Sequence, residues 1–119
     1  MCTFILKSYN QKEEIRNPHF FILNKGNNSG KPLLAPCPNC FVIIAENQEQ
    51  ADQLRTLCYA LWRCRAFEQH LHGSVIPFIT IRSFRSVMAF HIPIIEQHAA
   101  DFAQTVQALK LLEEREQNL

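Results

Sequence analysis

The sequence predicts a single α+β domain in which a small mixed sheet packs on a central helix, with a long C-terminal helix. Short runs rich in Phe, Ile and Leu in the first half of the chain indicate strands. Two longer segments with apolar residues at helical spacing, one central and one C-terminal, indicate helices. The chain has 119 residues, of which 47% are hydrophobic, and this is enough to fill one core.

Strands and loops are expected to alternate over the first 45 residues. The runs 2–7 and 19–23 are apolar and predict strands, and the polar segment 10–17 between them predicts a loop. Residues 24–32 hold the densest cluster of turn formers in the chain, so an exposed loop is expected there. The continuous apolar run 41–45 predicts a strand that is buried on both faces.

An amphipathic helix is predicted to begin after Asn47 and to end near Gly73. Asn47 can act as the N-cap, and Gln50 stands three residues on in a capping-box position. Apolar residues then recur at helical spacing. They are Ala51, Leu54, Leu57, Cys58, Leu61 and Cys64.

The last third of the chain predicts a strand, a one-turn helix, a second strand, a proline corner and a long helix. Residues 75–81 and 87–92 are expected to be the strands. Between them, Thr80 is expected to cap a single helical turn over residues 82–86. Pro93 is then expected to turn the chain into the terminal helix.

This corner divides the chain into an α+β recognition-like domain, residues 1–92, and a C-terminal helix, residues 93–119. The helix either belongs to the same domain or serves as a dimerisation arm. Its apolar residues follow alternating four- and three-residue steps, which is the pattern of a helix that packs along a partner helix. They are Ile95, Ala99, Phe102, Val106 and Leu109.

The net charge of +1 is distributed unevenly. Residues 1–92 contain 10 Lys and Arg against 6 Asp and Glu (+4), whereas residues 93–119 contain 2 against 5 (−3). A mildly basic body is compatible with a polyanionic partner, although nucleic-acid binders usually carry a stronger basic stripe. The short apolar start has no basic flank and the five cysteines form no disulfide pattern, so a cytoplasmic protein without a membrane segment is expected.

Short motifs stand in a defined order near the end of the chain. They are Gly73-Ser74, Ile76-Pro77, Phe84, Ile92-Pro93 and Glu96-Gln97. With them, residues 67–114 resemble the end of a target-recognition domain, and the start of its spacer helix, in specificity subunits of type I restriction-modification enzymes. The chain would hold one shortened copy of a domain that this family duplicates. The segments 24–26 and 36–41 also resemble short uncharacterised bacterial proteins with an Asn-Lys-Gly loop and a Pro-Cys-Pro-Asn-Cys-Phe motif.

The first resemblance implies non-enzymatic recognition of duplex DNA. Arginine can bind phosphate or guanine through two hydrogen bonds, and lysine can add contacts to phosphate. The candidate DNA-binding residues are Arg82, Arg85, Lys25, Lys31 and Arg63. The group of Trp62, Arg63 and Arg65 allows two interpretations: stacking with phosphate contact, or core packing with a charged opposite face. Core packing is favoured for Trp62.

The same resemblance has a consequence for oligomeric state. Two spacer helices pair in the related specificity subunits, which implies a homodimer formed through the apolar stripe of the terminal helix. The alternative function is a protein-interaction or oligomerisation module that uses this helix and does not bind DNA.

Cys37 and Cys40 form the one motif with chemical meaning of its own, because two thiols separated by two residues can share a metal or close a redox disulfide. The pair precedes a strand, whereas redox pairs open a helix, and Cys58 and Cys64 do not form a second zinc knuckle. A turn with packed thiols is therefore favoured, and zinc is the alternative. No catalytic residue, metal or cofactor is expected.

Structural roles are favoured for the histidines as well. His70 and His72 are expected at the end of the central helix, His91 on a strand and His98 on the terminal helix. His91 and His98 have no Ser, Cys or carboxylate nearby at a recognisable catalytic spacing.

Overall fold

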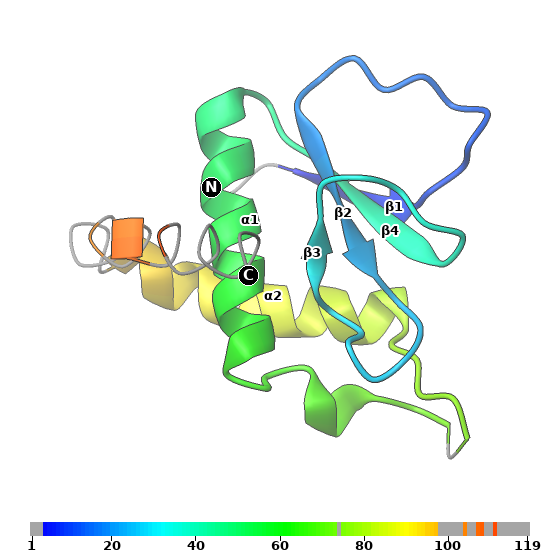
Figure 1. Cartoon of the computed structure of the whole chain (residues 1–119). Coiled ribbons are helices and arrows are strands. Elements are labelled where there is room, and N and C mark those ends of the chain that lie inside the picture. The colour runs from blue at the N-terminus through cyan, green and yellow to red at the C-terminus, as the bar shows by residue number, and fades with distance from the viewer. Residues whose placement is uncertain (1–3, 74, 98–103, 105–106, 109–110, 112–119) are drawn as a thin grey trace.

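In the part of the chain that the structure describes, an antiparallel sheet of four strands and two α-helices form a fold of the predicted α+β class (Figure 1). The computed structural model describes residues 4–73, 75–97, 104, 107, 108 and 111. In chain order the elements are β1 (Ile5–Ser8), β2 (His19–Leu23), β3 (Pro32–Leu33), β4 (Cys40–Ile44), α1 (Gln48–Arg63), the 3-10 helix η1 (Glu68–His70) and α2 (Ile81–Gln97).

The strand order is β1-β4-β2-β3, and every pairing is antiparallel, so the expected mixed sheet is wrong. The physical reason is that, among the described residues, no helix precedes β4 in the chain, whereas the crossover connection of a parallel pair is usually a helix. Strand β4 lies between β1 and β2, with Ile43 opposite both Leu6 and Phe20. This central position confirms the prediction that the apolar run near residues 41–45 is buried on both faces.

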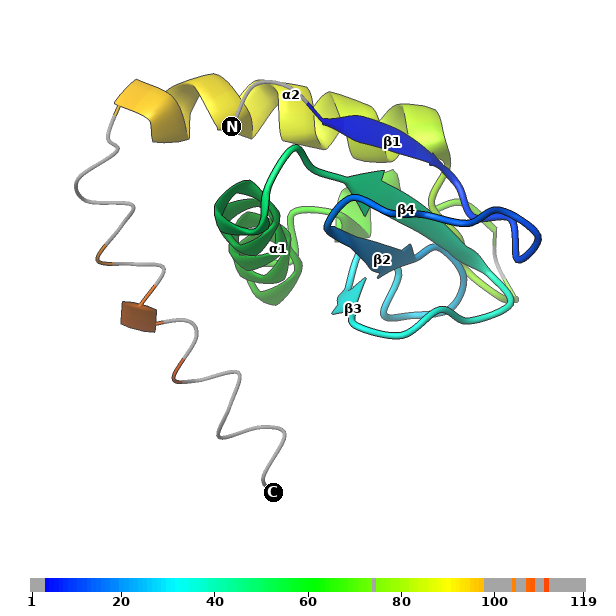
Figure 2. The same cartoon turned by 90° about the horizontal axis from the view of Figure 1, so that it is seen from above.

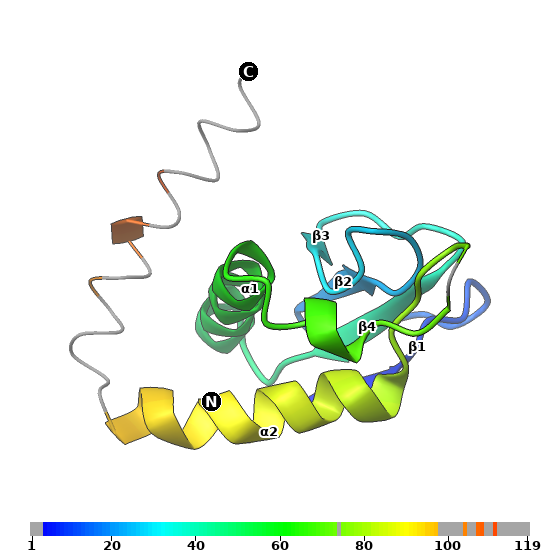
Figure 3. The same ribbon diagram turned by 90° about the horizontal axis from the view of Figure 1, so that it is seen from below.

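The face of the sheet that contacts the helices carries the main core. Alternating residues of the strands point to this face, as the period of a strand requires. They are Leu6, Phe20, Ile22, Phe41 and Ile43. Figure 2 shows α2 running beside β1, and Figure 3 shows that α1 and α2 run in different directions.

A smaller apolar cluster covers the opposite face. Phe21 and Val42, which pair across β2 and β4, are buried there under Tyr9 and Ile15. The ring of Tyr9 meets that of Phe21 edge-on with centroids 5.0 Å apart. The segment 10–17 is thus the loop that the sequence predicts, and it closes the second face.

Helix α1 begins as predicted. The Asn47 side chain accepts a hydrogen bond from the Gln50 backbone N–H at 2.8 Å, and the Gln50 side chain in turn accepts from the Glu46 N–H at 2.7 Å. The predicted apolar residues from Ala51 to Leu61 are buried, but Cys64 is exposed.

The end of α1 is at Arg63 and not near Gly73. Arg65 adopts the left-handed conformation, with φ at 61°. The N–H of Arg65 donates to the Trp62 carbonyl at 3.0 Å, and the N–H of Ala66 donates to the Leu61 carbonyl at 2.9 Å. These two bonds form a Schellman motif, which normally has glycine at the left-handed position. Because an arginine takes that place, no residue type in the sequence marks the stop.

The last third differs most from the prediction. Residues 75–81 form no strand, and Phe78 makes only isolated bridges to Lys25 and His72. Residues 87–92 are helical, and α2 runs without interruption from Ile81 through Pro93. The expected single turn over residues 82–86 is therefore the beginning of this helix.

Helical spacing explains why residues 87–92 are not a strand. Phe84, Val87, Met88 and Ile92 recur at helical intervals and are all buried in the main core. Thr80 caps the helix as predicted, since its hydroxyl oxygen accepts from the Ser83 N–H at 3.1 Å. Pro93 has no backbone N–H to donate, so α2 lacks one hydrogen bond at this point. Because Pro93 is exposed, water can replace the missing donor.

The division of the chain at Pro93 falls within α2 and not at a corner. Ile95 also lies within α2. The other residues of the predicted dimerisation stripe, Ala99, Phe102, Val106 and Leu109, lie outside the described residues.

The loop after β2 is anchored to the core at one end. Lys25, Asn27 and Asn28 are exposed as predicted, but Ser29 and Gly30 are buried. Gly30 lies against the ring of Phe67, which is itself stacked on Phe84 with ring centroids 5.0 Å apart.

This contact predicts that Gly30→Ala is more damaging than Gly26→Ala. Both glycines have left-handed φ values, 100° and 99°, so each alanine costs about 1 kcal/mol of strain. A Cβ at Gly30 would lie 2.3 Å from the Phe67 ring, whereas a Cβ at Gly26 would meet no atom within 4 Å. In urea denaturation Gly30→Ala should lose roughly 1–3 kcal/mol more than Gly26→Ala. Equal losses would contradict the packing of Phe67 on Gly30.

Candidate functional site

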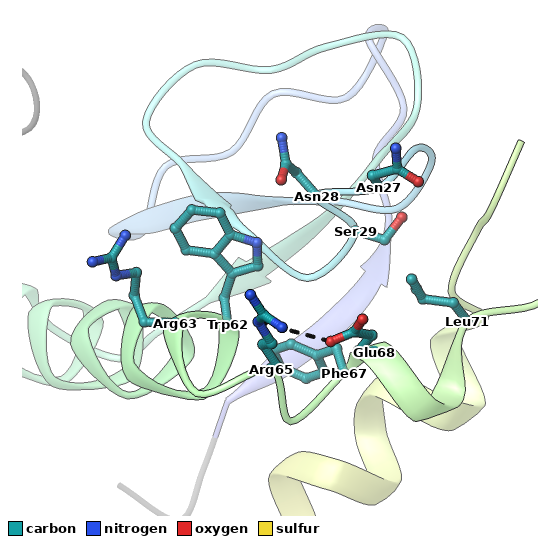
Figure 4. Close-up of a pocket in the computed structure, with 9 residues that line it drawn as sticks. All are labelled: Asn27, Asn28, Ser29, Trp62, Arg63, Arg65, Phe67, Glu68 and Leu71. Carbon is teal, nitrogen blue, oxygen red and sulfur yellow. Dashed lines mark ion pairs between the residues drawn. The ribbon is translucent and has the colours of Figure 1, made fainter.

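A hollow of about 600 Å³ lies between the loop after β2 and the turn that follows α1 (Figure 4). Figure 4 shows Trp62 and the segment 27–29 facing each other across it. The lining residues are Asn27, Asn28, Ser29, Trp62, Arg63, Arg65, Phe67, Glu68 and Leu71.

Backbone hydrogen bonds hold the loop side of the hollow. The N–H of Gly30 donates to the Leu23 carbonyl at 2.7 Å, and the N–H of Leu23 donates to the Lys31 carbonyl at 3.0 Å. At the tip, the Ser29 hydroxyl donates to the Gly26 carbonyl at 2.7 Å. The N–H of Gly26 donates to the Pro77 carbonyl at 2.7 Å, which ties the loop to the segment before α2. Asn27 and Asn28 are therefore presented on a firmly held turn.

The Schellman turn after α1 holds the other side. It places the guanidinium of Arg65 between Trp62 and Glu68 (Figure 4). Arg65 Nε and Glu68 Oε2 are 4.0 Å apart, and both side chains are largely exposed. An exposed ion pair of this length contributes little to stability, so Arg65 can exchange this partner for an anionic ligand.

Trp62 packs against the core, as the sequence favoured, and part of it is also open to the hollow. Lys31 Nζ lies 5.0 Å from the centroid of its ring, a cation–π arrangement. The chain contains no other tryptophan.

The structure brings only some of the predicted DNA-binding residues together. Arg63 lines the hollow, whereas Lys31 does not line it but places its Nζ over the ring of Trp62, which does. Lys25 stands at the start of the same loop, where its backbone bridges to Phe78. Arg82 and Arg85 are on α2 and do not line the hollow, and Arg85 Nη2 donates to the Leu6 carbonyl at 3.1 Å.

Four polar residues of the hollow had no predicted role in binding: Asn27, Asn28, Ser29 and Glu68. Asn27 and Asn28 could have been proposed as the amides of a glycine-rich turn, whereas phosphate contact is already one interpretation of Arg65, together with Trp62 and Arg63. The left-handed conformation of Arg65 has no sequence signal, since glycine is the usual residue there.

The charge balance of the hollow favours an anion. Arg63 and Arg65 line it, against the single carboxylate of Glu68 among the lining residues, and Lys31 Nζ lies over the ring of Trp62. The amides of Asn27 and Asn28 can donate or accept hydrogen bonds. Such a set can bind phosphate groups together with a planar polar group.

The cysteine pair is a local turn at the start of β4. The Cys40 thiol donates to the Cys37 carbonyl at 3.2 Å, and the Cys37 thiol donates to the Asn39 carbonyl at 3.3 Å. Burial raises the pKa of the Cys40 thiol, whereas a redox-active thiol has a lowered pKa. Within the described part of the chain, no group of three or more His, Cys, Asp or Glu residues is placed to hold a metal ion.

The histidines are placed differently from the prediction. His70 lies in η1 and His72 in the segment after it, because α1 has already ended. His91 lies on α2 and not on a strand, with its ring edge-on to that of Phe90. His98 lies outside the described residues.

Cysteine labelling in the native protein should follow burial. Cys58 is fully buried beside Met88, with burial raising its pKa, whereas Cys64 is exposed. Iodoacetamide at pH 8 followed by peptide mass spectrometry should modify Cys64 first and Cys58 only after addition of urea. Labelling of Cys58 as fast as Cys64 without urea would contradict the packing of α1 against α2.

Comparison with known proteins places the chain in a family. Among the described residues, no helix has both the length and the apolar character needed to cross a membrane. No curated protein and no solved structure matches the sequence. Residues 6–119 match the model of a family of unknown function, DUF6943, and the chain belongs to that family.

Proposed function

We propose that this protein is a non-enzymatic module that binds duplex DNA through the basic surface around the hollow. The observation that carries the proposal is the gathering of Lys31, Arg63 and Arg65, from two separate segments, around one recess. Cations that converge on one surface are the electrostatic signature of phosphate binding.

The backbone of Arg65 supports this proposal. A left-handed arginine costs about 1 kcal/mol relative to glycine at the same position. Strained positions of this kind cluster at functional sites, where the side chain is needed. The guanidinium stands in the hollow, and a bidentate donor there suits a phosphate.

The proposal rests on this surface and not on the order of elements. The resemblance to restriction specificity subunits implied a strand, a helical turn and a second strand in the last third, and α2 occupies most of that region. DNA binding through this surface is therefore independent of a relation to those subunits.

The net charge of residues 1–92 sets the affinity that we expect for DNA. A net charge of +4 over residues 1–92 is modest, so affinity for duplex of random sequence should be weak and should fall as salt rises. Lys25, at the start of the loop, adds one more cation near the same surface.

Replacing Arg65 by glycine should raise the stability of the protein and lower its affinity for DNA. Arg65→Gly removes the strain and should raise the free energy of unfolding by about 1 kcal/mol in urea denaturation. In fluorescence anisotropy with a labelled random-sequence duplex at low salt, the same variant should bind more weakly. The slope of log affinity against log salt should also fall by about 1, since one phosphate contact is lost.

A double variant, Arg82→Ala with Arg85→Ala, serves for comparison, because both residues were also predicted from the sequence to bind DNA. They do not line the hollow, so a smaller loss than that of Arg63→Gln with Arg65→Gly is expected. No binding by the parent protein, or unchanged binding by the Arg63 and Arg65 variant, would refute the proposal.

Self-association is a second candidate function. Phe90 and Ile94 lie one turn apart on α2 with 68% and 46% of their surfaces exposed. Large apolar side chains exposed together favour contact with another surface. A second copy of the chain is the proposed partner, as the stripe from Ile95 to Leu109 predicts from the sequence.

Sedimentation velocity tests this second candidate. The parent protein should form dimers, and Phe90→Asp or Phe102→Asp should shift it to monomers while the far-UV circular dichroism stays unchanged. Val75→Asp is the matched control, because Val75 is 90% exposed and lies on a different segment. A parent protein that is monomeric at the highest concentration would exclude the dimer.

A further inference from the structure

We infer that the hollow seats one unpaired nucleotide of the bound DNA, with its base against Trp62. This inference rests on the proposed function, because it names the part of the DNA that enters the site. The bound group is an extrahelical base, and the side-chain amides of Asn27 and Asn28 contact its polar edge.

The shape of the site is the first argument. A protein reads a duplex by placing a protruding helix, ribbon or loop into a groove. A hollow is complementary to a group that protrudes from the DNA, and a base that has left the stack is such a group. The volume of about 600 Å³ falls within the usual range for sites that enclose an organic ligand.

The lining is the second argument. Trp62 offers an aromatic surface, and Phe67 and Leu71 add apolar surface. Unstacked bases bind to proteins by stacking on aromatic side chains and by hydrogen bonds along their polar edges. Side-chain amides can satisfy both donors and acceptors of a base edge.

The position of the cations is the third argument. Arg63 and Arg65 line the hollow, and Lys31 lies over the Trp62 ring at 5.0 Å. A nucleotide that is seated in the hollow brings its phosphates close to Arg63 and Arg65, which line it. An aromatic surface next to such cations suits a nucleotide better than it suits a simple anion.

The two sides are held in place before any ligand binds. The loop is fixed by the bonds of Gly30 to Leu23 and of Gly26 to Pro77, and the Phe67 ring is held between Gly30 and Phe84. Preorganisation of this kind lowers the entropic cost of seating a base.

Fluorescence of Trp62 tests the inference directly, because this is the single tryptophan of the chain. Three duplexes of the same sequence are titrated: fully paired, with one bulged nucleotide, and with one bulged abasic site. The bulged duplex should quench the fluorescence and bind on the order of tenfold more tightly than the other two, through stacking of its base. The fully paired and abasic duplexes should bind with little quenching.

Two variants connect this preference to the hollow, with anisotropy of labelled DNA as the readout. Trp62→Leu and Asn28→Ala should weaken binding of the bulged duplex more than binding of the fully paired one, so that the preference for the bulge falls. Asn28 is exposed, so its variant should fold normally even if loss of Trp62 disturbs the core. Asn17→Ala is the matched control, since Asn17 is exposed and does not line this hollow.

The possible failures are distinguishable. Equal binding of all three duplexes without quenching, or an abasic bulge that binds as tightly as the complete one, would overturn the inference and leave DNA binding intact. Absence of binding to every duplex would overturn the proposed function and the inference together.

Discussion

The packing of Phe67 is the contact on which the rest of the structure depends. Its ring, 1% exposed, lies against the backbone of Gly30 on one side and stacks on Phe84 at 5.0 Å. Three segments far apart in the sequence, the loop after β2, the turn after α1 and helix α2, therefore meet at one side chain. The hollow exists because this contact brings the loop and the turn together without closing the space above them.

The candidate site is built from irregular backbone on a rigid support. The sheet and the helices supply the main core, whereas Asn28 and Arg65 belong to turns at the ends of β2 and α1. Binding residues commonly lie on such connections, because their backbone can adopt conformations that a helix or strand excludes. Arg65 is the clearest case, because its left-handed backbone is strained and a glycine at this position would not be.

A resemblance carried by short motifs was a weak guide to this fold. The residues from Gly73 to Gln97 stand in the order that suggested a strand, a turn and a second strand, yet most of them are in one helix. Motifs of two residues constrain the local backbone little, and a run rich in Val, Met and Ile suits both a buried helix and a strand. The candidate function therefore depends on which side chains the tertiary structure brings together.

Elements with local physical causes could be predicted from the sequence. The Asn47 cap, the Thr80 cap, strand β2 and the central strand β4 all follow from hydrogen-bonding side chains or from apolar runs within a few residues. The end of α1 and the approach of Lys31 to Trp62, beside Arg63, could not be predicted in this way. These features depend on contacts between distant segments, above all that of Phe67 with Gly30 and Phe84, and local sequence patterns do not encode such contacts.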